Sequence, residues 1–77
     1  MPTIFRWNGY RFYFFSNEGH EPAHIHVDRI GNTAKIWLNS VSVASNRGFS
    51  DYALREICAK VTERRDEFLA AWEMFFI

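Results

Sequence analysis

The sequence is organised around residues 19–28, which read GHEPAHIHVD and contain all three histidines of the chain. Residues 23–28 have the composition of a β-strand that follows a turn. Side chains along a strand point alternately to opposite faces, so His24, His26 and Asp28 would share one face while the apolar residues between them share the other. We therefore expect a strand with one polar face and one core face at the centre of the fold.

An aromatic hairpin is predicted immediately before this stretch. Residues 3–7 and 10–15 are rich in aromatic and β-branched side chains, and Asn8-Gly9 between them is a strong signal for a two-residue turn. Such a turn fixes the register of the two strands. The predicted pairs are Trp7 with Tyr10, Arg6 with Arg11, Phe5 with Phe12, Ile4 with Tyr13, and Thr3 with Phe14.

The segments after the hairpin continue as an antiparallel meander. A polar loop at residues 16–22 is long for a hairpin and is therefore a place where functional residues are expected. The remaining predicted elements are a third strand at residues 23–29, a turn at Gly31-Asn32, a fourth strand at 33–38, and a short edge strand at 41–44, before residues 45–48 break the alternation.

The hydrophobic period changes to that of a helix near residue 50. Ser50 is placed as an N-cap, and Asp51 suits the positive end of a helix. Apolar residues then recur at helical spacing up to Phe75, in one helix or two in tandem. We predict a single α+β domain over residues 1–77, with a four- or five-stranded antiparallel sheet in residues 1–44, packed by a long C-terminal helix in residues 50–76.

Composition limits the function classes. Nine basic and nine acidic residues give no net charge, which argues against a protein that holds nucleic acid mainly by neutralising phosphates. Residues 1–49 nevertheless carry five basic and three acidic side chains, and residues 50–77 carry four and six. Residues 1–15 are too aromatic, and too interrupted by Arg6, Asn8 and Arg11, for a secretory signal, and no apolar run approaches the length of a membrane span. We therefore expect a cytoplasmic protein without membrane contact. The single cysteine, Cys58, lies in an apolar stripe and is expected to be packed and inert.

The opening Met1-Pro2-Thr3-Ile4, the aromatic hairpin and the segment His20-x-Pro22-x-His24-x-His26 together resemble a family of small bacterial proteins. This family is a domain of unknown function numbered four-one-six-zero, and the resemblance covers nearly the whole chain. Ala23 and Ile25 depart from the usual Pro-Pro-His-Phe-His segment but leave the histidines in place. The resemblance implies one component of a two-gene module of the toxin and antitoxin type, which binds a protein encoded nearby.

Metal binding is one hypothesis for the histidines. Two histidines at alternate positions of a strand can share one ion, His20 could join them from the loop, and Asp28 or Glu21 could add an oxygen ligand. The predicted metal ligands are therefore His20, His24, His26 and Asp28, and the expected cofactor is a divalent transition metal.

Two further hypotheses remain open from the sequence. In the first, His24 and His26 act as metal-free acid and base on RNA, and Arg6 and Arg11, opposite each other in the hairpin, bind the phosphate anion. In the second, the domain binds a protein partner or a second copy of itself, and the histidines are structural.

The apolar C-terminal tail bears on the partner-binding hypothesis. Trp72, Phe75 and Phe76 either fold back onto the sheet or form an interface with the partner. Pro2 is not expected to serve as an amino-terminal catalytic base, because a tight hairpin follows the first strand where the small tautomerases that use such a proline have a helix.

Overall fold

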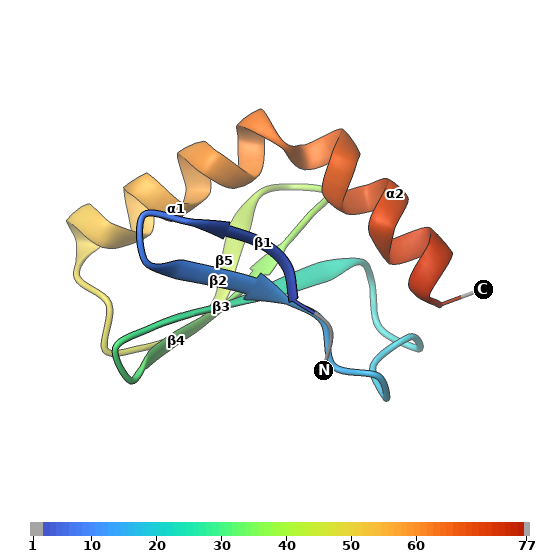
Figure 1. Cartoon of the computed structure of the whole chain (residues 1–77), viewed down its shortest axis with the longest axis horizontal. Coiled ribbons are helices and arrows are strands. Elements are labelled where there is room, and N and C mark those ends of the chain that lie inside the picture. The colour runs from blue at the N-terminus through green and yellow to red at the C-terminus, as the bar shows by residue number, and fades with distance from the viewer. Residues whose placement is uncertain (1–2, 77) are drawn as a thin grey trace.

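The computed structural model describes residues 3–76 as one five-stranded antiparallel sheet with two helices packed on one face (Figure 1). Met1, Pro2 and Ile77 lie outside the described residues, so the predictions that involve them stand outside this description. The strands follow one another in the sheet in chain order, as a meander. The predicted α+β meander is thereby confirmed. The strands are β1 (Thr3–Trp7), β2 (Tyr10–Tyr13), β3 (His24–Arg29), β4 (Asn32–Trp37) and β5 (Ser42–Arg47).

The predicted turn at Asn8-Gly9 is present, and both residues have positive φ angles of 52° and 82°, as the tight hairpin turn requires. Three of the five predicted pairs across it are confirmed: Trp7 with Tyr10, Arg6 with Arg11, and Phe5 with Phe12. The other two pairs are wrong, because the register shifts between Thr3 and Phe5 and Thr3 pairs with Tyr13 instead. A bulge of this kind places an extra residue in one strand. It ends β2 early and frees Phe14 to pack against Trp72, with ring centroids 5.3 Å apart.

The later strands differ from the prediction at their ends. The turn between β3 and β4 is formed by Ile30 and Gly31, with φ angles of 49° and 81°, one residue earlier than expected. The sheet does not end at residue 44, because β5 runs from Ser42 to Arg47. All six residues of β5 are exposed, so this edge strand has no buried face whose alternation would have revealed it in the sequence.

The C-terminal segment forms two helices, α1 (Asp51–Glu63) and α2 (Arg65–Phe75). Ser50 caps α1 as predicted, because its hydroxyl accepts a hydrogen bond from the Ala53 N–H at 3.1 Å. The helices are separated by Arg64, whose φ and ψ are −110° and 19°. The bend at this residue directs α2 downward at the end of the sheet (Figure 1). A straight helix would project beyond the sheet, whereas the bent one packs its last turns against the β2–β3 loop.

The helices cover one face of the sheet, and the core lies between the two layers. Its fully buried residues come from alternate positions of β2, β3 and β4 and from one side of each helix, and include Phe12, Val27, Ile36, Ile57, Val61 and Phe68. The opposite face of the sheet, which we call the open face, is not covered by a helix (Figure 1). No helix among residues 3–76 is long and apolar enough to cross a membrane.

Candidate functional site

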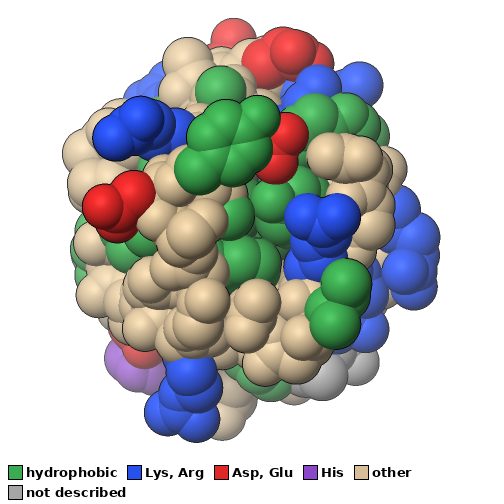
Figure 2. Space-filling view, turned by 90° about the vertical axis from the view of Figure 1, so that its left-hand side faces the viewer, with side chains coloured by type: hydrophobic (Ala, Val, Ile, Leu, Met, Phe, Trp, Pro, Cys, Tyr) green, Lys and Arg blue, Asp and Glu red, His purple; other side chains and the backbone are tan. Residues whose placement is uncertain are grey.

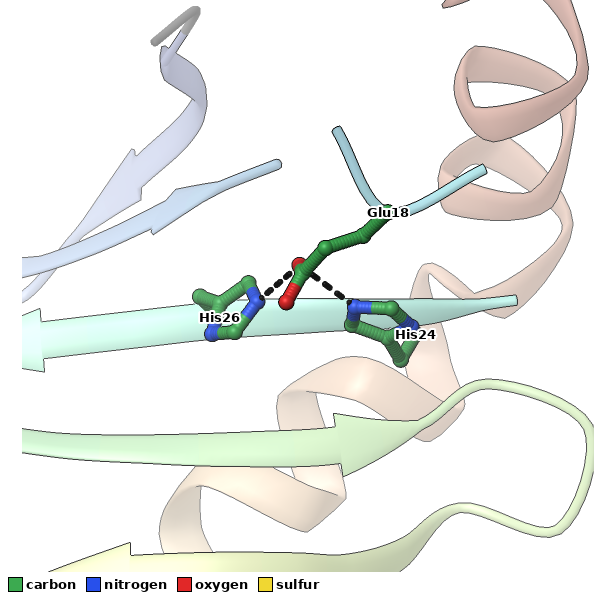
Figure 3. Close-up of side chains that lie close together, drawn as sticks. All are labelled: Glu18, His24 and His26. Carbon is green, nitrogen blue, oxygen red and sulfur yellow. Dashed lines mark hydrogen bonds and ion pairs between the residues drawn. The ribbon is translucent and has the colours of Figure 1, made fainter. Parts of the chain in front are cut away.

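Three side chains from the β2–β3 loop and β3 converge at one end of the open face (Figure 3). His24 and His26 share a face of β3 as the alternation predicts, and the loop folds back so that Glu18 lies between them. One Glu18 carboxylate oxygen, Oε1, lies 2.8 Å from His24 Nε2 and 2.7 Å from His26 Nε2. The ligand atoms of the three residues all lie within 4.8 Å of one another. We call Glu18, His24 and His26 the histidine–glutamate cluster.

The loop that carries Glu18 is held by local contacts. The Glu21 N–H donates to the Glu18 carbonyl at 3.1 Å, which closes a turn. Gly19 packs directly under Phe76, so closely that a Cβ built at Gly19 would lie 2.6 Å from the Phe76 ring. A side chain at this position would have to displace the ring. The end of α2 therefore helps to position the loop and its carboxylate.

His24 is fully buried and its orientation is fixed from three sides. Its Nδ1 lies 2.9 Å from the carbonyl oxygen of Pro22. Its ring lies between Trp37 and Trp72, with centroids at 5.6 Å and 4.9 Å. Because a carbonyl oxygen only accepts hydrogen bonds, Nδ1 carries the proton and donates it, and Nε2 points at Glu18.

His26 lies between aromatic rings. Tyr13 stacks on it with centroids 5.5 Å apart, and Phe15 meets it edge-on at 4.5 Å. Burial lowers the pKa of His26 below its usual value, although the neighbouring Glu18 carboxylate works in the opposite direction. At neutral pH, His26 is therefore a neutral imidazole, the form that binds metal ions.

Glu18 is four-fifths buried, with 20% of its side chain exposed. Burial alone would raise the pKa of its carboxyl, but the hydrogen bonds from His24 and His26 outweigh this effect, so the pKa lies below its usual value. The cluster thus combines an ionised carboxylate with two imidazoles. These are the oxygen and nitrogen donors that Zn²⁺ and Fe²⁺ take in proteins.

The polar atoms of this cluster can be paired in two ways, either without a metal ion or with one. In the metal-free form, Glu18 Oε1 accepts from both Nε2 atoms, which requires His24 to be doubly protonated because its Nδ1 already donates to Pro22. That form places an imidazolium in a fully buried position, where a charge is costly even when paired. In a metal-bound form, the two Nε2 lone pairs and the Glu18 carboxylate would instead serve as ligands of the ion. The hydrogen bond from His24 Nδ1 to a backbone carbonyl is the usual support of a metal-binding histidine.

The other predicted metal ligands lie outside the cluster. The His20 side chain is 76% exposed, and its Nε2 lies 4.0 Å from a carboxylate oxygen of Glu21. Asp28 shares the polar face of β3 but lies opposite Arg11, with their charged atoms 3.7 Å apart. Glu21, the alternative oxygen ligand, pairs with Lys35 at 2.5 Å. Sequence reasoning missed Glu18, since nothing in the sequence shows which loop residue folds back over the strand.

The two arginines predicted to bind an anion face each other across the β1–β2 hairpin. Arg6 is exposed, whereas Arg11 extends over the Tyr13 ring at 4.2 Å and pairs with Asp28. Asp28 thus relieves part of the repulsion between them. Among residues 3–76, neither arginine forms an ion pair or a hydrogen bond with Glu18, His24 or His26.

The C-terminal aromatic residues fold back onto the domain. Trp72 is buried against Phe14 and His24, and Phe76 lies on Trp72 with ring centroids 4.1 Å apart. Phe75 keeps 37% of its surface exposed. Of the three residues predicted to form a partner interface, two are therefore used within the domain and only Phe75 is substantially exposed.

A hollow lies at the opposite end of the molecule from the histidine–glutamate cluster. It is a pocket of about 400 Å³ near the start of α1, lined in part by Ile30, Phe49 and Ala53. Figure 2 faces this end and shows hydrophobic side chains gathered around the hollow. Its lining residues include no histidine or carboxylate, and it therefore offers less chemistry than the cluster.

Comparison with known proteins identifies the family of the chain but no specific function. The model of one family, described as Domain of unknown function (DUF4160), matches residues 9–73, which confirms the resemblance predicted from the sequence. No curated protein and no solved structure matches the chain.

Proposed function

The chain belongs to the DUF4160 family, whose function is unknown, and we propose from its own geometry that it binds one divalent transition metal ion through Glu18, His24 and His26. The observation that carries this proposal is the convergence of two imidazole nitrogens on one carboxylate oxygen, at 2.7 Å and 2.8 Å. The fixed tautomer of His24, set by Pro22, supports the same conclusion.

The donor set also suggests which ions fit. Two histidines and one carboxylate occur in zinc enzymes and in non-haem Fe²⁺ sites, and three protein ligands leave coordination positions open. An ion held in this way would act as a Lewis acid toward a water or substrate oxygen. The chain's own residues would orient the imidazoles and keep bulk water away, since His24 is fully buried and only 13% of the His26 side chain is exposed.

Metal-free acid–base catalysis on RNA receives less support from this geometry. A general acid or base must come within hydrogen-bonding distance of its substrate. His24 is fully buried, and the Nε2 atoms of both histidines point at Glu18 rather than toward solvent. A substrate would first have to displace the loop.

The test of metal binding is the native mass of untagged protein, purified without chelators and supplied with Zn²⁺ or Fe²⁺. We expect one ion per chain in the wild type. Glu18→Gln keeps the size of the side chain but removes its charge. Because it removes a carboxylate ligand, it should lower the metal affinity by at least the roughly tenfold to hundredfold that loss of an outer-shell partner typically costs. His26→Asn should also weaken binding, whereas His20→Ala, which changes an exposed histidine outside the cluster, should not. Equal metal loading in all four proteins would contradict the proposal.

Partner binding in the cytoplasm, within a two-gene module of the toxin and antitoxin type, is a second candidate function. It is supported by β5, an edge strand whose six residues are all exposed. The strand carries a single charge, Arg47, and no proline, so its outer edge is free to pair with a strand of another protein. The test is co-expression with the product of the neighbouring gene, followed by native mass measurement. A complex that is lost in Ala44→Pro but retained in Ser40→Pro, in the turn before β5, would support this role. A monomer in every case would refute it.

A further inference from the structure

One row of side chains crosses the open face from edge to edge. Residues that pair across neighbouring antiparallel strands point to the same face of the sheet. The register pairs Arg6 with Arg11, Arg11 with Asp28, Asp28 with Thr33, and Thr33 with Arg47. These five residues, one from each strand, form what we call the arginine row. It lies beyond the part of the face that the β2–β3 loop covers.

The arginine row is positively charged. Its three arginines and one aspartate give a charge of +2, and only Arg11 has an ion pair within the row, to Asp28 at 3.7 Å. Arg6 and Arg47 are exposed and make no ion pair with any residue in the described range 3–76. Two cations at the ends of the row are therefore available to an external anion.

Although the whole chain has no net charge, its basic and acidic residues are unevenly divided between the sheet and the helices. Residues 50–77 carry four basic and six acidic side chains, a net charge of −2, and include both helices, which lie on the other face. Residues 1–49 carry five basic and three acidic side chains, a net charge of +2, and include all five strands of the sheet. An extended anion would be attracted to the open face and repelled from the helical face.

Aromatic side chains lie on the same open face. Trp37 is half-buried, next to Lys35, whose ammonium nitrogen lies 4.7 Å from the Trp37 ring centroid. Phe15 is also half-buried and extends the aromatic surface beside His26. A positively charged groove or face with partly exposed aromatic rings is the usual platform for single-stranded nucleic acid, whose phosphates pair with the cations and whose bases stack on the rings.

We propose that the open face binds single-stranded nucleic acid, with phosphates along the arginine row and a base on Trp37. Neighbouring strands are about 4.8 Å apart, so the row, which spans four such spacings, is about 19 Å long. It can therefore follow a backbone over several nucleotides, whereas a duplex would present its stacked bases away from the aromatic rings. The arginine row contains no residue of the histidine–glutamate cluster. Trp37 packs against His24, with ring centroids 5.6 Å apart, so the binding test is made with the metal removed.

The test is fluorescence anisotropy with labelled oligouridine, oligothymidine and an RNA duplex of equal length, with the metal removed. If all three arginines contact phosphates, the logarithm of the binding constant should fall with a slope of about −2 against the logarithm of salt concentration. Affinity should then drop roughly twentyfold between about 50 and 200 mM salt. Arg6→Ala and Arg47→Ala should each reduce the slope by about 0.7. Arg55→Ala removes the same charge from exposed α1 and is the matched control.

The outcomes separate the alternatives. Tighter binding of oligouridine than oligothymidine would identify RNA as the ligand, and equal binding would extend the proposal to either single strand. Trp37→Leu should weaken binding about tenfold through lost stacking. The proposal is overturned if the duplex binds as well as the single strands, if Arg55→Ala has the same effect as Arg6→Ala, or if no oligonucleotide binds at low salt.

Discussion

The substitution Glu18→Gln tests the cluster through the stability of the protein, independently of any activity. In metal-free protein, the Glu18 carboxylate accepts hydrogen bonds from His24 and His26 at 2.8 Å and 2.7 Å. A hydrogen bond to a charged group contributes about 1.5–3 kcal/mol, and one between neutral groups about 0.5–1.5 kcal/mol. Replacing the carboxylate by an amide should therefore cost roughly 1 kcal/mol for each of the two bonds, or about 2 kcal/mol before solvent screening is considered.

Screening lowers this figure only moderately, because 20% of the Glu18 side chain is exposed. For a domain of this size, 1 kcal/mol corresponds to about 4–8 °C in the melting temperature. We therefore expect Glu18→Gln to melt about 10 °C below the wild type in chelator at neutral pH. The wild-type advantage should disappear as the pH falls through the lowered pKa of Glu18, because the carboxylate stabilises the fold only when ionised.

Adding metal should widen the difference between the two proteins. An ion at a hundred times its dissociation constant stabilises the folded state by about 2.7 kcal/mol, and only the wild type should gain the full amount. The assay is thermal denaturation followed by circular dichroism, with chelator and then with Zn²⁺, and His20→Ala serves as the control. Equal melting temperatures for Glu18→Gln and the wild type in chelator, together with equal gains in metal, would refute the reasoning.

Three further predictions concern single residues. Gly19→Ala should displace Phe76, because the added Cβ would lie 2.6 Å from its ring, and should lower both stability and metal affinity; unchanged values in thermal melts and metal titrations would be inconsistent with that packing. Ser50→Ala should cost about 1 kcal/mol in denaturant unfolding through the lost bond to Ala53, and a change below about 0.3 kcal/mol would show that the cap contributes little. Burial lowers the pKa of His26 in the folded protein, so the unfolded chain binds the proton more readily, and stability should fall as pH drops below about 6.5. In chelator, the loss of stability per pH unit should be smaller in His26→Phe than in the wild type. An equal loss in both proteins would contradict the assignment of this pH dependence to His26.

The local signals in the sequence predicted most of the fold. Asn8-Gly9 specifies its turn through the positive φ angles that only a few residues accept, and Ser50 marks the start of α1 through a bond three residues away. Features that depend on distant contacts were missed. The bulge in β1 and the length of β5 leave no trace in hydrophobic alternation, because a bulge is defined by its partner strand and an exposed edge strand has no buried face.

The candidate site shows the same limit. Strand alternation correctly placed His24 and His26 on one face, but it says nothing about distance along the strand. Residues two apart on a strand are separated by about 7 Å, so Asp28 is about 13 Å along the strand from His24 and cannot share an ion with it. Glu18 reaches both histidines because the loop folds back, and that path is set by tertiary packing on α2.

The most direct test of the central claim is X-ray absorption spectroscopy of untagged protein loaded with one equivalent of Zn²⁺. The account predicts a first shell of nitrogen and oxygen at about 2.0–2.2 Å, with the scattering pattern of two imidazoles that is reduced in His26→Asn and unchanged in His20→Ala. A shell without imidazole scattering, or a spectrum that His20→Ala alters and His26→Asn does not, would contradict the metal site.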